Sequence, residues 1–155
     1  MLDPNITACR EKRDLMRQYM ETGAWIDFTQ GIDIRLVNDA DIDDLNGMKI
    51  KRLHLAWDNP KDDLEDRFRR FSDRFAVKDN RRKIVYCLTN FEDVTEQEHI
   101  DCALFRVYRL RDMGYDPYIM VYDKPHAPKR IKELQRWCNS KWIFKSCRRF
   151  EDYTT

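Results

Sequence analysis

Hydrophobic and polar positions in the first third of the chain switch between a helical period and a strand period. A spacing of three and four residues predicts a helix over residues 6–22, and Gly23 is placed to end it. Residues 25–36 are predicted to form a strand, in which Gly31 indicates a bulge or a close backbone approach. Asp39 is suited to cap the short helix that follows.

The middle of the chain repeats this order of strand and helix. Residues 52–57 are predicted to form a strand, and residues 58–60 to turn into a second amphipathic helix. The apolar stripe of that helix consists of Leu64, Phe68, Phe71 and Phe75. A polar loop over residues 78–83 then leads to an apolar strand over residues 84–89.

The last third of the chain adds one more strand between two helices. Residues 95–98 form a capping box, which predicts the start of a long helix that Gly114 ends. A fourth strand over residues 118–122 and a final helix that begins at Pro128 complete the pattern. The apolar residues 142–144 indicate that the tail packs against the domain.

The alternation of strands and helices predicts one α/β domain over residues 1–155. Four strands joined by helices are expected to form parallel βαβ units with right-handed crossovers. Four parallel strands are too few to close an eight-stranded barrel. We therefore expect either an open sheet or a sheet that another chain or a missing segment completes.

The charges of the chain nearly cancel, with 29 Lys and Arg against 28 Asp and Glu and a net charge of +1. This balance predicts no general attraction to nucleic acid or to anionic membranes. The basic clusters at residues 81–83 and 148–149 are interpreted as solvated faces. No segment approaches the length of a membrane helix and no signal-peptide pattern opens the chain, so we expect a cytoplasmic protein.

The five cysteines are far apart in the sequence, which argues against a disulfide framework and against a local zinc or iron–sulfur site. We expect buried free thiols, and we expect no metal ligands within the chain. The cysteines are Cys9, Cys87, Cys102, Cys138 and Cys147.

Polar side chains gather at the carboxyl ends of the predicted strands, where parallel α/β folds place their working residues. They are Gln30, Asp33 and Arg35 for the first strand, Asp58 and Asn59 for the second, Asn90 for the third and Tyr122 for the fourth. On the second strand, the face of His54 and Asp58 is polar, and the opposite face carries Leu53, Leu55 and Trp57. We expect the polar face to line a ligand cavity.

Three of these side chains allow two interpretations each. Asp58 is suited either to accept a hydrogen bond from a ribose hydroxyl or an ammonium group, or to cap the next helix. His54 is either a ligand-contacting residue or a core histidine whose hydrogen bonds are satisfied. Arg35 either binds an anion or forms an ion pair with Asp33 or Asp58.

The order and wording of several segments resemble the later strands of the radical S-adenosylmethionine (radical SAM) superfamily. The segments are LDPN at 2–5, FTQGIDIRLVND at 28–39, RLHLAWDNPKDDL at 52–64, KIVYCLTNFEDVTEQE at 83–98, MGYDPYIMVYDKP at 113–125 and LQRWCNSKWIFKSC at 134–147. The resemblance implies that the four strands form the second half of a partial (βα)₆ TIM-like barrel.

The same resemblance implies roles for the polar strand ends. It assigns Asp58, Asn59 and Asn90 to contacts with S-adenosylmethionine, although the family usually has a glycine in the adenine-contacting loop where Asn90 stands. It assigns Gln30, Asp33, Arg35, His54 and Tyr122 to the substrate side of the barrel interior.

A complete family member holds a [4Fe–4S] cluster on the three cysteines of a C-x3-C-x2-C loop, and the cluster with S-adenosylmethionine supplies its radical chemistry. This chain has no such triplet, and Cys9 is its one cysteine near the start. The chain opens at what resembles the end of the family's second strand. We therefore expect the C-terminal portion of a radical SAM enzyme core, with no cofactor of its own and not competent for radical chemistry alone.

Three alternatives stay open. The chain could be one half of a split radical SAM enzyme, with a partner chain that carries the cluster half. It could be a non-catalytic ligand-binding or scaffold module, or an unrelated enzyme that depends on Asp58 or His54. In each case the first strand lacks its natural neighbour, and its open edge predicts a two-fold homodimer.

Overall fold

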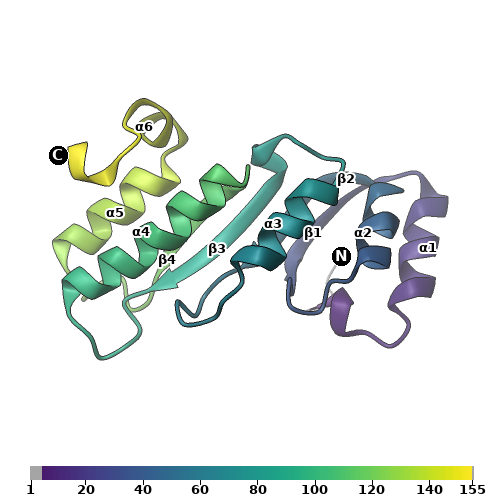
Figure 1. Cartoon of the computed structure of the whole chain (residues 1–155), viewed down its shortest axis with the longest axis horizontal. Helices are drawn as coiled ribbons and strands as arrows, with labels where there is room; N and C mark the ends of the chain where they lie inside the picture. Colours follow the sequence, from purple (N-terminus) through teal and green to yellow (C-terminus); the bar gives the residue numbers. More distant parts are fainter. Residues whose placement is uncertain (1–4, 155) are drawn as a thin grey trace.

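The computed structural model describes residues 5–154 as a curved sheet with helices packed against it (Figure 1). The strands are β1 (Trp25–Ile32), β2 (Lys49–Ala56), β3 (Lys83–Thr89) and β4 (Asp116–Val121). The α-helices are α1 (Lys12–Thr22), α2 (Asp39–Asn46), α3 (Glu65–Arg74), α4 (Glu96–Asp112), α5 (Lys129–Asn139) and α6 (Lys141–Ser146). Three short 3₁₀ helices are η1 (Ile6–Ala8), η2 (Asn80–Arg82) and η3 (Phe150–Asp152).

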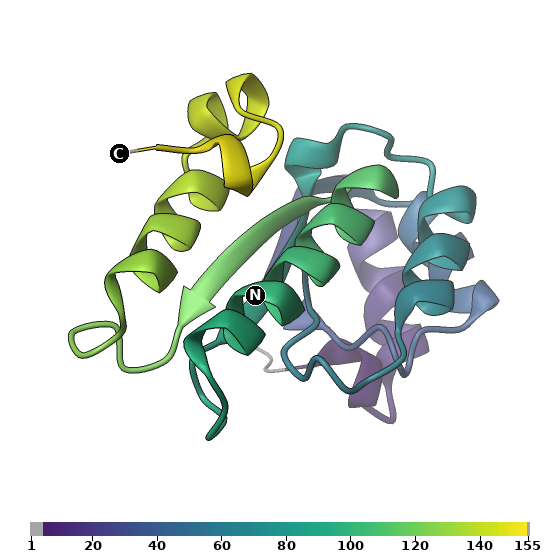
Figure 2. The ribbon, with the colours of Figure 1, turned by 60° about the vertical axis from the view of Figure 1, so that its left-hand side comes forward.

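The strands pair in their sequence order, β1-β2-β3-β4, and every pair is parallel. Right-handed crossovers between neighbouring parallel strands place all the connecting helices on one face of the sheet. Figures 1 and 2 show α3, α4 and α5 together on that side. The predicted α/β fold with four parallel strands is therefore confirmed, and within residues 5–154 the sheet is open, with β1 and β4 at its edges.

The two faces of the sheet differ in their burial, as the alternation in β2 predicts. Leu53, Leu55 and Trp57 lie under the helices and are at most 1% exposed. The opposite face keeps large side chains in contact with solvent: Trp25 is 64% exposed, and Tyr118 and Met120 on β4 are 39% and 46% exposed. One face is thus the hydrophobic core, and the other is left partly uncovered.

Two predicted elements near the start of the chain are shorter than the sequence indicates. The predicted helix over residues 6–22 is divided, because Cys9 has an extended backbone between η1 and α1. The predicted strand over residues 25–36 ends at Ile32, because the chain turns there and the Leu36 N–H donates to the Asp33 carbonyl oxygen. Gly31 has a φ of 87°, at a register shift between β1 and β2, so the predicted bulge is confirmed.

The helix caps follow the predictions in part. Thr95 and Glu98 form the predicted reciprocal capping box at the start of α4. The cap of α2 is Asn38 instead of Asp39, because the Asn38 side chain accepts the backbone N–H of Asp41. Pro128 stands at the N-cap of α5, so the helix begins at Lys129, one position after the predicted start.

Lys83 is the clearest departure from the predicted polar loop at residues 78–83. It begins β3 and is 1% exposed, with its Nζ 3.1 Å from the Ser72 hydroxyl and 4.9 Å from the centre of the Tyr115 ring. These contacts replace part of the hydration that the ammonium group loses. Burial still lowers the pKa of Lys83.

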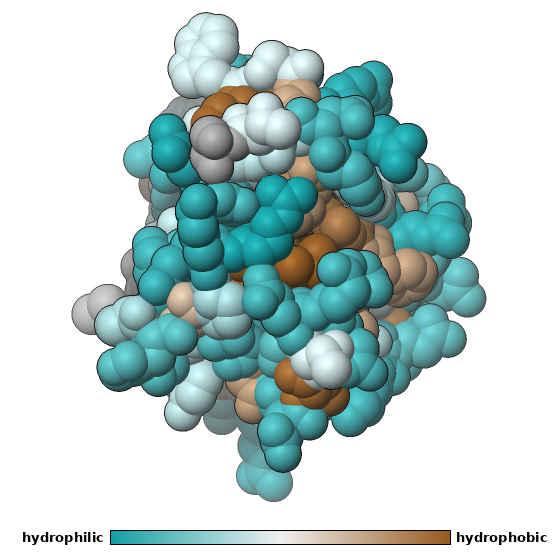
Figure 3. Space-filling model, turned by 90° about the vertical axis from the view of Figure 1, so that its left-hand side faces the viewer, coloured by the Kyte–Doolittle hydropathy of each residue, from teal (hydrophilic) through white to brown (hydrophobic). Residues whose placement is uncertain are grey.

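The tail packs through some of its aromatic residues, as predicted. Phe144 and Phe150 are buried against Trp137 of α5, whereas Trp142 is 87% exposed. Figure 3 shows that hydrophilic side chains cover most of this end of the molecule, with a hydrophobic area near the centre of the view. No helix in residues 5–154 combines the length and the apolar composition needed to cross a lipid bilayer.

Candidate functional site

A cavity of about 310 Å³ lies at the carboxyl ends of β1 and β2. It is lined by five of the predicted strand-end residues, Gln30, Asp33, Arg35, Asp58 and Asn59. Asn5, Asp62 and Tyr86 also line it and were not predicted from the sequence. The rule that parallel sheets collect polar groups at their carboxyl edge therefore located most of the polar lining of the cavity from the sequence.

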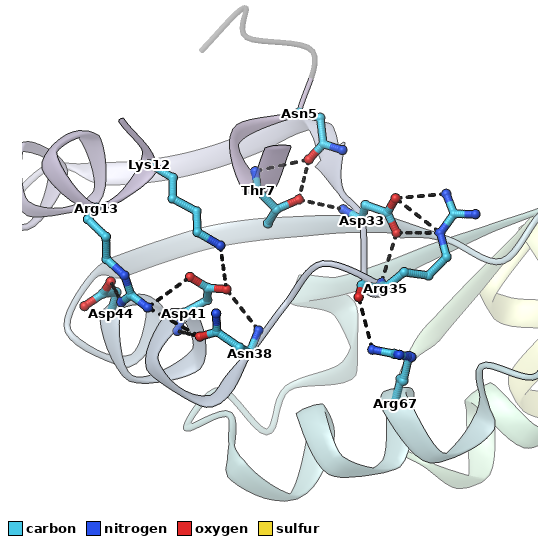
Figure 4. Close-up of polar contacts among 10 residues, drawn as sticks. All are labelled: Asn5, Thr7, Lys12, Arg13, Asp33, Arg35, Asn38, Asp41, Asp44 and Arg67. Carbon is cyan, nitrogen blue, oxygen red and sulfur yellow. Dashed lines mark hydrogen bonds and ion pairs between the residues drawn. The ribbon is translucent and has the colours of Figure 1, made fainter. Parts of the chain in front are cut away.

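Arg35 and Asp33 form a forked ion pair at one side of the cavity (Figure 4). Arg35 Nε lies 2.9 Å from Asp33 Oδ1 and Arg35 Nη2 lies 2.8 Å from Asp33 Oδ2. The hydrogen bond from Arg35 is the main reason why the pKa of Asp33 is lowered. Of the two interpretations of Arg35, the ion pair with Asp33 is the one that the structure contains, in the turn after β1.

A short chain of hydrogen bonds holds this turn in place (Figure 4). The Asn5 side chain accepts the Thr7 hydroxyl and the Thr7 N–H, and the Asp33 N–H lies 3.4 Å from the Thr7 hydroxyl oxygen. From the other side, Arg67 of α3 donates to the Arg35 carbonyl oxygen at 3.0 Å. The ion pair is therefore fixed by both the N-terminal segment and the third helix.

Asp58 connects the ends of two neighbouring strands. Its Oδ1 accepts the backbone N–H of Leu88 on β3 at 3.2 Å. Loss of hydration raises the pKa of the Asp58 carboxyl, an effect larger than the opposing hydrogen bond from Leu88. The helix-cap interpretation is wrong, because α3 begins at Glu65 after an N-cap residue, Leu64, that makes no side-chain cap bond.

Arg106 of α4 supports this edge from beneath and was missed by the sequence analysis. It is 1% exposed, and its guanidinium donates to the carbonyl oxygens of Trp57 at 2.6 Å and Leu88 at 3.0 Å. These carbonyls terminate β2 and β3, so one buried cation satisfies acceptors that the sheet leaves unpaired. Its position within an amphipathic helix gave no signal, because arginines on helices are usually solvent-exposed.

His54 lies on the open face of the sheet, between Asp27 of β1 and Tyr86 of β3. Its Nδ1 is 2.9 Å from the Tyr86 hydroxyl, and its Nε2 is 3.5 Å from Asp27 Oδ1. Burial is the main reason why the pKa of His54 is lowered, and Asp27 opposes that shift. The interpretation of His54 as a histidine with satisfied hydrogen bonds fits in part: Nδ1 has a partner in Tyr86, whereas Asp27 Oδ1, the oxygen near Nε2, makes no hydrogen bond within residues 5–154. His54 does not itself line the cavity, but its hydrogen-bond partner Tyr86 does.

Asn90 and Tyr122 lie next to each other at the ends of β3 and β4, outside the lining of the cavity. The Asn90 Nδ2 donates to the Tyr122 carbonyl oxygen at 3.1 Å. Asn90 has a φ of 64°, a left-handed conformation that glycine adopts easily and asparagine tolerates better than most residues. The backbone at Asn90 therefore has a conformation that would also accommodate a glycine.

The cysteines do not assemble a cluster site in the described residues. None of the five forms a disulfide; Cys87 and Cys138 are buried as expected, whereas Cys9, Cys102 and Cys147 are partly exposed, so the expectation of buried thiols is wrong for these three. No group of three or more Cys, His, Asp or Glu residues in positions 5–154 has an arrangement suited to a metal ion. The side chains present therefore do not fit a [4Fe–4S] cluster, which takes Cys thiolates as ligands.

In comparisons with known proteins, the chain matches no family, no curated protein and no solved structure. Residues Leu2–Pro4, which carry most of the first segment of the resemblance, lie outside the described residues. The cavity and the open face of the sheet are therefore the features of this chain that bear on its function.

Proposed function

We propose that this chain is the C-terminal portion of a radical SAM enzyme core, and that its strand ends contribute contacts to S-adenosylmethionine and to a substrate. The observation that carries the proposal is the cavity at the carboxyl edge of the sheet. There the residues after β1, Asp33 and Arg35, and the residues after β2, Asp58 and Asn59, line the same space. The chain alone is not competent for the radical chemistry, because its described residues do not fit the cluster.

The arrangement of the sheet supports the proposal. Consecutive parallel strands with their helices on one face are the geometry of a barrel segment, and the uncovered face then corresponds to the barrel interior. That face carries Asp27, His54 and Tyr86 in hydrogen-bonding or near hydrogen-bonding contact. Such a group is suited to a ligand-facing interior, because His54 and Tyr86 hold each other in place while the buried Asp27 Oδ1 makes no hydrogen bond within residues 5–154.

The chemistry of the cavity fits parts of S-adenosylmethionine. The carboxylate of Asp58 is suited to accept hydrogen bonds from ribose hydroxyls or from the ammonium group of the methionine moiety. Arg35 is 59% exposed at its side chain and keeps donors available beside Asp33, so it is suited to a carboxylate of the cofactor or substrate. When bound with its cluster, S-adenosylmethionine would supply the radical that abstracts hydrogen from the substrate.

The proposal includes a cluster-bearing half, either on the same polypeptide or on a partner chain. Within residues 5–154, β1 pairs with β2 alone, so its other edge is where the preceding strand of a barrel would join. A second copy of this chain is the alternative occupant of that edge. We place the protein in the cytoplasm, where thiols stay reduced, in keeping with five cysteines that form no disulfide.

The test is calorimetric titration of the chain with S-adenosylmethionine. We expect saturable binding, and we expect Asp58→Asn to weaken it by about tenfold or more, because a charged hydrogen-bond acceptor is lost. Asp63→Asn is the matched control: it removes the same charge from an exposed residue outside the cavity lining, and we expect no change. Absence of saturable binding at millimolar ligand, or equal losses in both variants, would contradict the proposal.

A ligand-binding module without radical chemistry is the second candidate. The observation that favours it is that the cavity forms entirely from this chain. In that case Asp58→Asn would abolish binding of another small polar ligand, and S-adenosylmethionine would not compete for the cavity. The same titration therefore separates the two candidates.

A further inference from the structure

Two basic clusters that are far apart in the sequence converge in the structure. Arg81, from the cluster at residues 81–83, and Arg148, from the cluster at residues 148–149, both line a second cavity of about 230 Å³. This cavity lies where β3 and β4 begin, at the opposite edge of the sheet from the first cavity. Its other lining residues are Asn80, Arg111, Asp116, Lys141, Phe144 and Lys145.

The lining of this second cavity is strongly cationic. Five of its side chains are Lys or Arg, and Asp116 is the one carboxylate among the lining residues. Asp116 is occupied by Lys141 at 2.7 Å, and Arg81 is paired with Asp79 at 2.9 Å. Lys145 and Arg148 form no ion pair with any residue in the described part of the chain. Their positive charge is therefore not neutralised by an ion pair within residues 5–154.

Arg111 gives the cavity a positioned guanidinium. Its Nη1 donates to the Arg148 carbonyl oxygen at 2.6 Å, and its guanidinium carbon lies 4.9 Å from the Tyr108 ring centre and 5.4 Å from the Phe144 ring centre. Its Nε is shielded from solvent and has no hydrogen-bond partner in residues 5–154. A guanidinium fixed between two rings beside cations without ion-pair partners is typical of a site for a multiply charged anion.

We propose that this second cavity binds a small ligand that carries phosphate groups, in a site separate from the strand-end cavity. Phosphate oxygens accept hydrogen bonds from several guanidinium and ammonium donors at once, which matches a lining of convergent Arg and Lys side chains. Phe144 adds an apolar wall against which the organic part of such a ligand packs. The volume of about 230 Å³ suits a small molecule and not an extended polymer.

No single segment of the sequence indicates this site, because each basic cluster by itself is typical of a solvated face. Residues 81 and 148 come together because η2 and the segment after α6 both lie beside the end of α4. The net charge of +1 also hides the local excess of positive charge. The proposal does not depend on the radical SAM assignment.

The experiment is titration of the chain with inorganic pyrophosphate at low ionic strength. Calorimetry measures the binding, and NMR monitors the arginine Nε–H groups. We expect saturable binding, a shift of the Arg111 Nε–H signal, and an affinity that falls as salt is added. The double variant Lys145→Gln/Arg148→Gln should weaken binding by at least about tenfold, because it removes two charged hydrogen-bond donors.

The control is a double variant with the same change of charge away from the cavity, Arg17→Gln/Lys129→Gln, at two exposed positions on α1 and α5. We expect it to bind pyrophosphate as the parent does, and circular dichroism should show both double variants folded. Equal weakening in the two variants would mean nonspecific charge attraction and overturn the proposal. Absence of saturable pyrophosphate binding would also overturn it, as would binding of a single-stranded oligonucleotide with no competition by pyrophosphate.

Discussion

Arg106 Nη1 lies 2.7 Å from the carbonyl oxygen of Asp58, so a buried cation on α4 holds the backbone of the residue that bridges β2 and β3. Burial lowers the pKa of Arg106, which shows the cost of placing a guanidinium beneath the sheet. Four carbonyl oxygens compensate for that cost, those of Trp57, Asp58, Leu88 and Cys102. The position of Asp58 therefore depends on a residue that follows it by 48 positions.

Replacing Arg106 should destabilise the protein strongly. Arg106→Ala leaves several buried carbonyl oxygens without donors, and we expect a loss of about 3 kcal/mol or more in the free energy of unfolding. Urea denaturation at neutral pH measures it. Arg109→Ala on the same helix is the control, since Arg109 is 51% exposed at its side chain and should cost less than about 1 kcal/mol. Similar losses for the two variants would contradict the supporting role of Arg106.

Asp58 and Asp33 should respond to pH in opposite directions. The folded state raises the pKa of Asp58 above its ordinary value of 3.8, so the ionised carboxylate costs stability above that pH. Asp58→Asn removes this cost, and its amide oxygen can still accept the Leu88 N–H. We therefore expect the variant to be at least as stable as the parent at pH 7, with the difference disappearing as the pH falls below 3.8.

Asp33 provides the matched comparison. Its pKa lies below 3.8, so its stabilising effect is full above 3.8 and is lost as the pH falls through the lowered pKa. Asp33→Asn should therefore destabilise the protein at pH 7, and the loss should shrink in acid. Urea denaturation of both variants between pH 7 and pH 3 makes the comparison. The same pH trend in both would refute the assignment of the two shifts.

His54 should resist protonation in the folded protein. Burial lowers its pKa below 6.5, so the unfolded chain takes up the proton first and stability is lost as the pH falls from above 6.5 through the lowered pKa. NMR titration of the imidazole should place the His54 midpoint below 6.5, and His54→Gln should remove its share of the acid-induced loss. His126→Gln, at a side chain that is 83% exposed, is the control. A His54 midpoint at or above 6.5 would count against this account.

Asn90 should tolerate glycine but not a branched residue. Its φ of 64° is costly for a β-branched side chain, and we expect Asn90→Val to lose roughly 1–2 kcal/mol of unfolding free energy. Asn90→Gly should change stability far less, because the conformational relief offsets the lost hydrogen bond to Tyr122. Thermal denaturation compares the two variants, and a larger loss for glycine than for valine would contradict the prediction.

The edge of β1 that has no partner strand within residues 5–154 should be covered by a second molecule when the chain is studied alone. Exposed strand edges present unpaired N–H and C=O groups, and a two-fold axis would pair two copies of β1. Sedimentation velocity at micromolar concentration is the measurement, and we expect a dimer that dissociates on dilution. A monomer throughout that range would show that the edge does not self-associate.

Local patterns determined the elements of this protein well. The stripe of Leu64, Phe68, Phe71 and Phe75 is buried as predicted, and the Thr95 capping box starts α4. Such features depend on residues within one or two turns of each other, so the sequence alone contains their cause. The alternation in β2 likewise identified the covered face, and the order of strands and helices indicated a parallel sheet.

Only the tertiary structure decided which side chains meet. The Tyr86 hydroxyl reaches His54, the guanidinium of Arg106 reaches the Asp58 carbonyl, and Arg81 and Arg148 share one cavity. These partners are separated by 32 to 67 positions, because the sheet and its helices bring distant segments together. Burial then changes what a residue does: an arginine on a helix is expected in solvent, but beneath this sheet it satisfies the strand ends. The sequence by itself determined the elements and their faces, and packing decided the contacts between them.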